Sequence, residues 1–181
     1  MKFACLLANG FEETEAISVI DVLRRAKIEV DLVSIQELEV IGSHLIKVIA
    51  DKKWIDMEGY DGVFCPGGQP GTNNLMNDPK VISFIQKMNT EQKWVTAICA
   101  APLVFEKAGI IKGKKMTSYP LQDLDGHFKD AHYLEDPVVR DGNIITSRGM
   151  GTAMHLGFAI VEACGIDSIA LQKSTIFLGK I

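Results

Sequence analysis

The chain has 181 residues, of which 47% are hydrophobic and 23% charged, and its formal net charge is -4 at pH 7. This composition is typical of a folded protein that buries its core without a metal or disulfide scaffold, so we expect one domain over residues 1–181 and no cofactor. The acidic balance argues against nucleic-acid binding, and no apolar run approaches the length of a membrane span, so we expect a cytosolic protein that has no membrane partner.

The first part of the chain predicts a strand, a helix, a second strand and a hairpin. Residues 2–8 form an almost wholly apolar run, typical of a parallel strand that is buried on both faces. Residues 11–26 carry apolar side chains at helical spacing after a cluster of glutamates, which predicts a helix. Residues 29–34 alternate and predict the second strand, and residues 39–50 predict a hairpin.

The middle of the chain predicts two further strands, with a helix after each. Residues 62–65 form a short apolar strand that ends at a Pro-Gly-Gly turn, and residues 69–77, rich in Gly, Asn and Pro, predict a loop. Pro79 suits the first position of the helix that follows. Residues 94–98 then predict a buried strand, and residues 100–108 a helix.

The last part of the chain predicts a hairpin and two helices. Residues 138–147 contain an Asp-Gly-Asn turn between two strand-like runs, and the glycine turn 148–152 leads into a helix over residues 153–163. Residues 168–181 predict a further helix, whereas residues 120–131 show no clear pattern. The alternation of strands and helices indicates one α/β layered domain with a mostly parallel sheet.

Three predicted loops follow strands of this sheet, at residues 9–15, 65–71 and 99–101. In a parallel sheet the loops after the strands meet at one edge, where ligands bind. We therefore expect these loops to form the functional site.

Cys99 lies where an apolar run ends and helix-favouring residues begin, within W-V-T-A-I-C-A-A. A thiol at such a junction can lie near a helix N-terminus, where free N–H groups favour the reactive thiolate. A free cysteine is more often a small core residue, and we expect this for Cys5, Cys65 and Cys164, since the chain contains no C-x-x-C pair. Cys99 therefore needs support from the neighbouring loops to be a candidate nucleophile.

Glu15 and the Pro-Gly-Gly turn supply that support. A glutamate in the first turn of a helix usually only complements the helix dipole, but a carboxyl group that points into a cleft has a raised pKa and could donate a hydrogen bond to a thiolate or transfer protons. Gly67 and Gly68 allow the backbone to approach a ligand, and the N–H of Gly68 could stabilise an oxyanion together with the N–H of Ala100. A simple tight turn is the alternative explanation for the two glycines.

A histidine often assists a reactive cysteine as base or orienting group. The chain has four histidines, and we select His132 as the candidate, although the sequence offers no reason to prefer it to His127. The sequence contains no metal-binding motif, so we expect no metal site.

Five motifs in order resemble the ThiJ/PfpI superfamily, and within it the DJ-1-like branch. They cover essentially the whole chain, and their order makes the resemblance specific: L-L-A-N-G-F-E-E-T-E-A, D-V-L-R-R-A, C-P-G-G, A-I-C-A-A-P and T-S-R-G-M-G-T. The resemblance implies a flavodoxin-like three-layer sandwich with a nucleophile elbow, and a homodimer. It carries the family's site positions over to the nucleophile Cys99, its protonated partner Glu15, the N–H groups of Gly68 and Ala100, and the side chains of His132 and Arg148.

Activities known in this branch are glutathione-independent glyoxalase, protein deglycase, and oxidation of the cysteine under stress. The resemblance therefore implies an enzyme that acts on a small dicarbonyl such as methylglyoxal, or on a glycated substrate, with Cys99 as nucleophile and Glu15 as acid/base. The alternative is a non-catalytic redox sensor or stress chaperone that responds to oxidation of Cys99. A protease role is disfavoured, because Ala100 stands where protease-like relatives have a histidine, and a thiamine-pathway role rests only on the family's inherited name.

Overall fold

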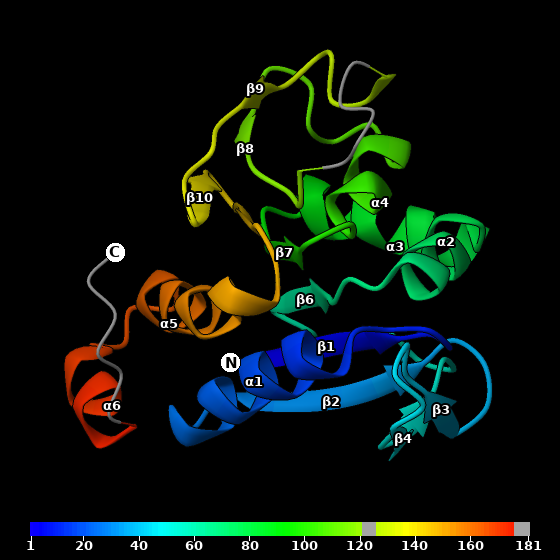
Figure 1. Ribbon diagram of the computed structural model, residues 1–181, viewed down its shortest axis with the longest axis horizontal. Helices are drawn as coiled ribbons and strands as arrows, with labels where there is room; N and C mark the ends of the chain where they lie inside the picture. The colour runs from blue at the N-terminus through cyan, green and yellow to red at the C-terminus, as the bar shows by residue number, and fades with distance from the viewer. Residues whose placement is uncertain (121–125, 176–181) are drawn as a thin grey trace.

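The computed structural model describes residues 1–120 and 126–175. Within these residues, seven strands form one central sheet (Figure 1), in which every neighbouring pair is parallel except β10 with β11. In their order across the sheet the strands are β10 (Val138–Asp141), β11 (Ile144–Ser147), β7 (Trp94–Ile98), β6 (Gly62–Cys65), β1 (Lys2–Leu7), β2 (Glu29–Ser34) and β5 (Lys52–Lys53).

Helices cover both faces of the sheet and form the outer layers. The first face packs against α1 (Glu13–Arg25) and α5 (Ala153–Ala163), and the second against α2 (Gln69–Met76), α3 (Pro79–Thr90) and α4 (Pro102–Lys107). Successive residues of β1 enter the two cores in turn, because side chains alternate across a strand: Phe3, Cys5 and Leu7 face α1, while Ala4 and Leu6 face α3 and α4. The predicted α/β architecture with a mostly parallel sheet is confirmed.

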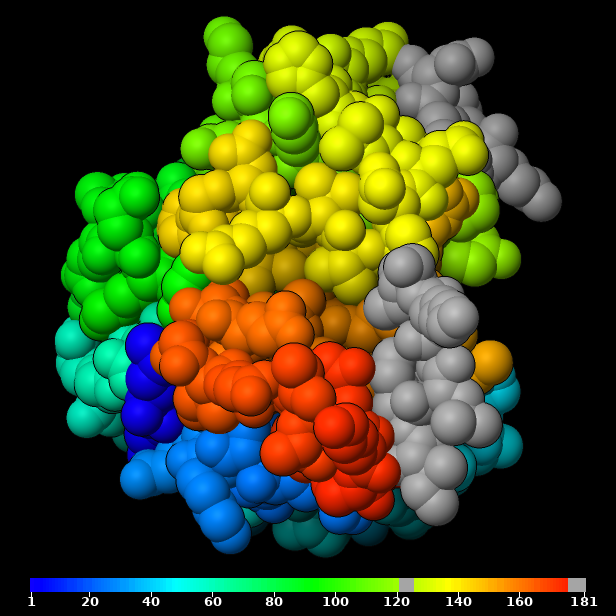
Figure 2. Space-filling model, turned by 90° about the vertical axis from the view of Figure 1, so that its left-hand side faces the viewer, coloured from blue at the N-terminus to red at the C-terminus, as the bar shows by residue number. Residues whose placement is uncertain are grey.

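The helix α6 (Ile169–Ser174) follows α5 near the end of the described chain. Figure 2 shows α5 and α6 on the surface between α1 and the segment that contains β10. The predicted helix over residues 168–181 is confirmed as far as α6 extends, and residues 176–181 lie outside the described residues. Across the described ranges, no helix combines the length and apolar character needed to cross a bilayer.

The predicted hairpin at residues 39–50 consists of β3 (Glu39–Ile41) and β4 (Lys47–Ile49), which pair antiparallel beside the main sheet. The second predicted hairpin is β10 with β11. Two short strands, β8 (Lys115–Met116) and β9 (His132–Tyr133), form a separate parallel pair, and residues 121–125 between them lie outside the described residues.

The predicted loop at residues 69–77 is wrong, because most of it is helix α2. Its sequence shows little helical pattern, since Leu75 is its main core side chain. The helix starts after Gly68 with Pro70 in its first turn, where the missing N–H of proline costs nothing. Packing against α3 and α4 stabilises a helix that its composition disfavours.

Candidate active site

Cys99 occupies a sharp turn between β7 and α4. Its φ angle is 63°, in the left-handed region that non-glycine residues rarely adopt. Two backbone hydrogen bonds hold the turn: the N–H of Cys99 donates to Ser147 O at 3.0 Å, and the N–H of Tyr119 donates to Cys99 O at 2.8 Å. The left-handed φ angle on a sharp strand-to-helix turn confirms the predicted elbow. Cys99 is only partly buried there.

Glu15 reaches the same point from the first turn of α1. Its residue is 1% exposed, and its Oε2 atom accepts a hydrogen bond from the N–H of Gly67 at 2.9 Å. A Cβ atom on Gly67 would lie 2.5 Å from Glu15 Oε2 and 2.6 Å from Cys99 Cβ, so no larger residue fits between the two side chains. The loops after β1, β6 and β7 therefore meet as the sequence predicts.

Burial and charge act together on the pKa values of this pair. Burial raises the pKa of Glu15 to about 7, against the opposing effect of the N–H of Gly67. Burial, and then the charge of Glu15, raise the pKa of the Cys99 thiol to about 12, although the N–H groups of Ala100 and Gly68 act to lower it. The N–H groups of Ala100 and Gly68 thus favour the thiolate, as the sequence predicts, and the charge of Glu15 no longer raises the thiol pKa when Glu15 carries the proton.

The two groups titrate as a pair. Above about pH 7 the pair carries one negative charge and retains one proton, which the sulfur and the carboxylate share as alternative positions. The reactive arrangement is a thiolate beside a protonated Glu15, and it has the same total charge as the resting one. Transfer of one proton over the Cys99–Glu15 contact is therefore enough to generate the nucleophile.

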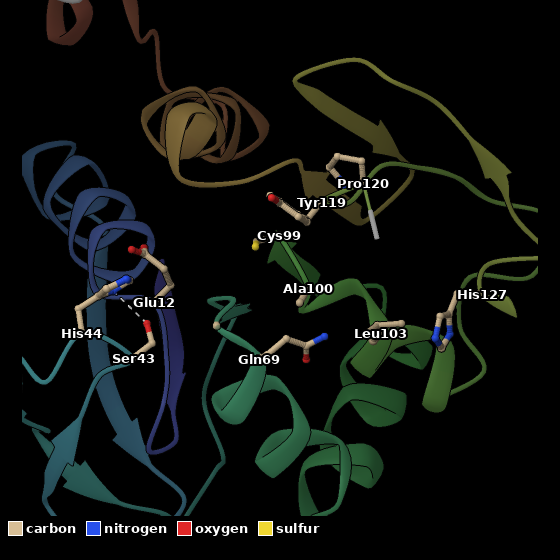
Figure 3. A pocket seen from close by; sticks show the side chains of 11 residues that line it. Glu12, Ser43, His44, Gln69, Cys99, Ala100, Leu103, Tyr119, Pro120 and His127 are labelled. Atoms are coloured by element: carbon tan, nitrogen blue, oxygen red, sulfur yellow. Dashed lines mark hydrogen bonds between the residues drawn. The ribbon is translucent and has the colours of Figure 1, made fainter. Parts of the chain in front are cut away.

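A cavity of about 750 Å³ opens above the thiol, and Cys99 and Ala100 form part of its lining (Figure 3). Glu12 and the hairpin residues Ser43 and His44 line one side. A volume of this size accommodates a small organic substrate.

The far side of this cavity is lined by Tyr119, Pro120 and His127. The Nδ1 atom of His127 lies 2.8 Å from Glu106 Oε2. His132 lies in β9, where its residue is exposed, and it is not among the residues that line the cavity. Of the two histidines that the sequence left open, the structure therefore brings His127 to the cavity.

Arg148 lies in a neighbouring cavity of about 410 Å³ rather than in the one above Cys99. Its guanidinium donates to Glu135 O at 2.9 Å. The two cavities share Tyr119 and Pro120 in their linings. The predicted substrate contact of Arg148 would thus need a ligand that extends beyond Tyr119.

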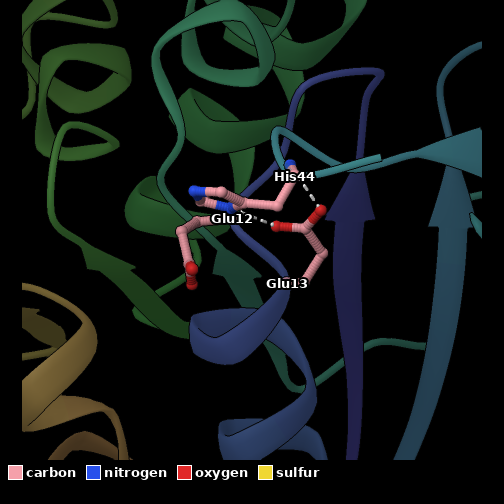
Figure 4. A group of neighbouring side chains, drawn as sticks. All are labelled: Glu12, Glu13 and His44. Atoms are coloured by element: carbon pink, nitrogen blue, oxygen red, sulfur yellow. Dashed lines mark hydrogen bonds and ion pairs between the residues drawn. The ribbon is translucent and has the colours of Figure 1, made fainter. Parts of the chain in front are cut away.

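His44 is a cavity residue that sequence reasoning missed, and Figure 4 shows how it is held. Its Nδ1 atom lies 3.0 Å from Glu13 Oε2, and its N–H donates to Glu13 Oε1 at 2.7 Å. This pairing raises the pKa of His44 and lowers that of Glu13. The only available signal was the acidic first turn of α1, which gives no indication of a partner about thirty residues away.

Glu12, Glu13 and His44 also form a group whose potential metal ligands lie within 4.8 Å of one another. Both carboxylates already have structural roles. Glu12 Oε2 caps α1 by accepting from the N–H of Glu15 at 2.6 Å, and Glu13 binds the hairpin backbone. These bonds account for the group without an ion.

The fold and the site together define a class: flavodoxin-like α/β proteins with a cysteine on a nucleophile elbow, paired with a buried glutamate. The family model described as "DJ-1/PfpI family" matches residues 1–163. The chain therefore belongs to the DJ-1/PfpI family, as its motifs predict.

Relatives in several organisms support this assignment. The chain is 40% identical over 160 residues to Protein DJ-1 homolog B of Arabidopsis thaliana, covering 86% of this chain but only 36% of that longer protein. It is 34% identical over 182 residues to the Parkinson disease protein 7 homolog of Danio rerio, covering 96% and 95% of the two chains. The chain thus spans about a third of the first relative and nearly all of the second.

Solved structures agree with the fold. The crystal structure of Drosophila melanogaster DJ-1beta superimposes with a TM-score of 0.90 at 32% identity, covering 99% of this chain and 98% of that one. A DJ-1 superfamily protein from Salmonella typhimurium gives a TM-score of 0.90 at 31% identity, covering 99% of each chain. The predicted flavodoxin-like sandwich is therefore confirmed.

Proposed function

We propose that the chain is a cysteine-dependent enzyme that converts reactive carbonyl compounds, in the manner of a glutathione-independent glyoxalase that takes methylglyoxal to lactate. Cys99 is the nucleophile and Glu15 the acid/base. The observation that carries the proposal is the meeting of both side chains at Gly67, below a cavity that a small dicarbonyl can enter.

The first step forms a covalent bond between enzyme and substrate. Glu15 takes the thiol proton, and the Cys99 sulfur attacks the aldehyde carbon of methylglyoxal. The electron pair of the carbonyl bond moves to oxygen, which receives the proton back from Glu15 and becomes the hydroxyl group of a hemithioacetal. The N–H groups of Gly68 and Ala100, which favour the thiolate, would also stabilise this oxygen as it gains charge.

The second step moves hydrogen between the two substrate carbons. Glu15 removes the hydrogen on the former aldehyde carbon as a proton, which gives an enediol, and returns that proton to the neighbouring carbon. The hydroxyl proton moves to the second oxygen, so the product is a lactoyl thioester on Cys99. One carbon is oxidised and the other reduced, so no external oxidant is needed. Water then hydrolyses the thioester and releases lactate and the free thiol.

A deglycase activity uses the same groups on a different substrate. A relative named a deglycase, from Pyrococcus horikoshii, is 33% identical over 150 residues, covering 82% of this chain and 90% of that protein. In such a reaction Cys99 would attack the carbonyl-derived carbon of a glycated amine, and Glu15 would protonate the leaving nitrogen. Free amine would then appear together with the hydroxy acid.

The test is lactate formation from methylglyoxal by wild type, Cys99→Ser and Glu15→Gln. We expect each variant to lose on the order of 100-fold or more in kcat/KM, because each removes a group that the chemistry requires. Cys164→Ser is the matched cysteine control, since Cys164 lies outside the cavity lining, and it should retain the wild-type rate. Wild-type turnover no faster than that of either variant would reject the proposal.

A redox-sensing function is the second candidate, and differences in cysteine exposure favour it. Cys5 and Cys65 are fully buried, whereas Cys99 and Cys164 are partly exposed, and of these two Cys99 lines the cavity and Cys164 does not. Graded peroxide should therefore produce sulfinic acid at Cys99 first. Intact mass and peptide mapping measure this, and equal oxidation of all four cysteines would contradict it.

A further inference from the structure

The charge of the cavity lining is uneven. Besides Cys99 and Tyr119, the titratable side chains among its described lining residues are Glu12, His44 and His127. Among the described residues that line it there is neither a lysine nor an arginine. The nearest arginine identified above, Arg148, lies in the neighbouring cavity and donates to a backbone oxygen.

Each imidazole of the lining has a carboxylate partner of its own. His44 is paired with Glu13, and His127 with Glu106. A proton on either ring is therefore offset by the carboxylate beside it. The pairings leave the charge of the lining to the Glu12 carboxylate and to the Cys99–Glu15 pair, and the pair carries one negative charge above about pH 7.

Glu12 is held in place with one oxygen to spare. Its Oε2 atom accepts from the N–H of Glu15, which fixes the carboxylate at the start of α1. No described lysine or arginine forms an ion pair with it. Figure 3 shows Glu12 beside His44 on one side of the cavity, with Cys99 between them and Tyr119.

We propose that Glu12 is the recognition group for a positively charged substituent, an ammonium or guanidinium, on the carbonyl compound that reacts at Cys99. The role of Cys99 in this statement rests on the proposed function, but the sign of the charge that the cavity accepts rests on Glu12 and its surroundings alone. The preferred substrates are cationic aldehydes or ketones, neutral dicarbonyls react more slowly, and anionic ones are disfavoured by the same field.

Thiol-reactive probes of different charge test this without any turnover. Three methanethiosulfonates differ in charge: the 2-(trimethylammonium)ethyl reagent is cationic, the 2-sulfonatoethyl reagent anionic and the methyl reagent neutral. All three react in the same way, because the Cys99 sulfur forms a mixed disulfide and methanesulfinate leaves. The second-order rate at Cys99 is followed by intact mass in a Cys164→Ser background. The rate constant of each charged probe is divided by that of the neutral probe, which corrects for changes in the reactivity of the thiol itself.

We expect the cationic-to-anionic rate ratio at Cys99 to exceed that of 2-mercaptoethanol, and to fall about tenfold in Glu12→Gln. Glutamine keeps the oxygen that caps α1, so the helix start should be preserved. Glu39→Gln, on the exposed hairpin strand, is the matched control and should leave the ratio unchanged. High salt should reduce the wild-type ratio, because it screens the charge.

A ratio that is the same in wild type and Glu12→Gln, or that falls equally in Glu39→Gln, would overturn the proposal. Cys5 and Cys65 report folding in the same spectra, because both are fully buried and stay unlabelled only in folded protein. A charge preference without lactate formation would support Glu12 recognition and reject the glyoxalase proposal. Lactate formation without a charge preference would support the glyoxalase proposal and reject recognition by Glu12.

Discussion

At the scale of single residues, the site depends on two groups whose pKa values are both raised by burial. The N–H of Gly67 binds Glu15, and the N–H groups of Gly68 and Ala100 favour the thiolate of Cys99. These donors offset part of the cost of placing a negative charge in a buried site. Because the pair retains one proton above about pH 7, its total charge does not change when the nucleophile forms.

The raised pKa of Glu15 predicts a specific loss of stability with pH. The carboxyl group has a folded-state pKa of about 7 and an ordinary value of 4.5. Between these values the unfolded chain has released the proton and the folded chain retains it, so the free energy of unfolding falls as pH rises. This one group should contribute a fall of about 3 kcal/mol, which is complete at about pH 8.

Urea unfolding of wild type and Glu15→Gln over this pH range measures that contribution. Glutamine does not titrate and can still accept the N–H of Gly67. We expect the difference in unfolding free energy between the two proteins to shift by about 3 kcal/mol in favour of Glu15→Gln as pH rises. Parallel pH profiles would show that Glu15 titrates at an ordinary pKa.

Gly67→Ala tests the contact that brings the pair together. The added methyl group would lie inside the contact distance of both Glu15 and Cys99, so it must displace one of them. We expect a loss on the order of 100-fold in turnover and about 1–3 kcal/mol in stability. Gly151→Ala is the matched control, because nothing lies within 4 Å of its Cβ position, and it should change neither quantity much.

At the scale of elements, the hairpin of β3 and β4 forms one side of the cavity because the start of α1 holds it. The N–H of Gly10 donates to Ile41 O at 2.7 Å, and the N–H of Ser43 donates to Phe11 O at 2.8 Å. Gly42 leaves room for the Glu13 carboxylate, which a Cβ atom there would overlap. The hairpin turn is thus attached to the loop that precedes Glu15.

Glu13→Ala should loosen this hairpin without unfolding the protein. The change leaves the backbone N–H of His44 without its acceptor, and we expect a cost of about 1–3 kcal/mol. Amide hydrogen exchange at His44 and Ile46 should accelerate relative to the core strands. Glu39→Ala removes only an exposed ion pair with Lys47 and should cost less than about 1 kcal/mol. An equal effect of the two changes would contradict the role of Glu13 in holding the hairpin.

At the scale of the whole molecule, strand order determines which loops meet. Strands β7, β6 and β1 are neighbours in the sheet and run parallel, so their carboxyl ends lie side by side. The loops that follow these three strands bring Cys99, Gly67 and Glu15 to one point. The site is therefore a consequence of topology and of one glycine that permits close approach.

Exposed apolar side chains on the hairpin support our proposal that the chain forms a homodimer. Leu45, Ile46 and Ile49 are 81%, 57% and 64% exposed, and the pairing of β3 with β4 places Ile41 on the same outward face as Ile49. Such groups on one element favour association with another copy. Light scattering should give twice the 19.9 kDa chain mass.

Leu45→Glu should shift this mass toward that of a single chain, because it places a charge within the apolar surface. Ile55→Glu introduces the same charge at another exposed position, outside the hairpin, and serves as the control. A wild-type mass of one chain, or an unchanged dimer in Leu45→Glu, would reject this interface.

The sequence alone determined most of the elements and the centre of the site. Apolar runs and the turns after them are local patterns, so the strands of the main sheet other than the short polar β5, and the loops carrying Cys99, Glu15 and Gly67, could be recognised without coordinates. The family motifs surround these same residues. Helix α2 was missed, because its stability comes from packing on α3 and α4 rather than from its own composition.

Only the tertiary structure decided which further groups accompany the thiol. His127 lines the cavity, whereas His132 does not. Arg148 lines the neighbouring cavity. His44 reaches the site from the hairpin, where Glu13 holds it. The structure also brought Glu15 against the thiol, so burial and the charge of Glu15 act against the N–H groups of Ala100 and Gly68, and the protonation of Cys99 is coupled to that of Glu15. These properties depend on contacts between residues far apart in the chain, and local sequence patterns carry no information about such distances.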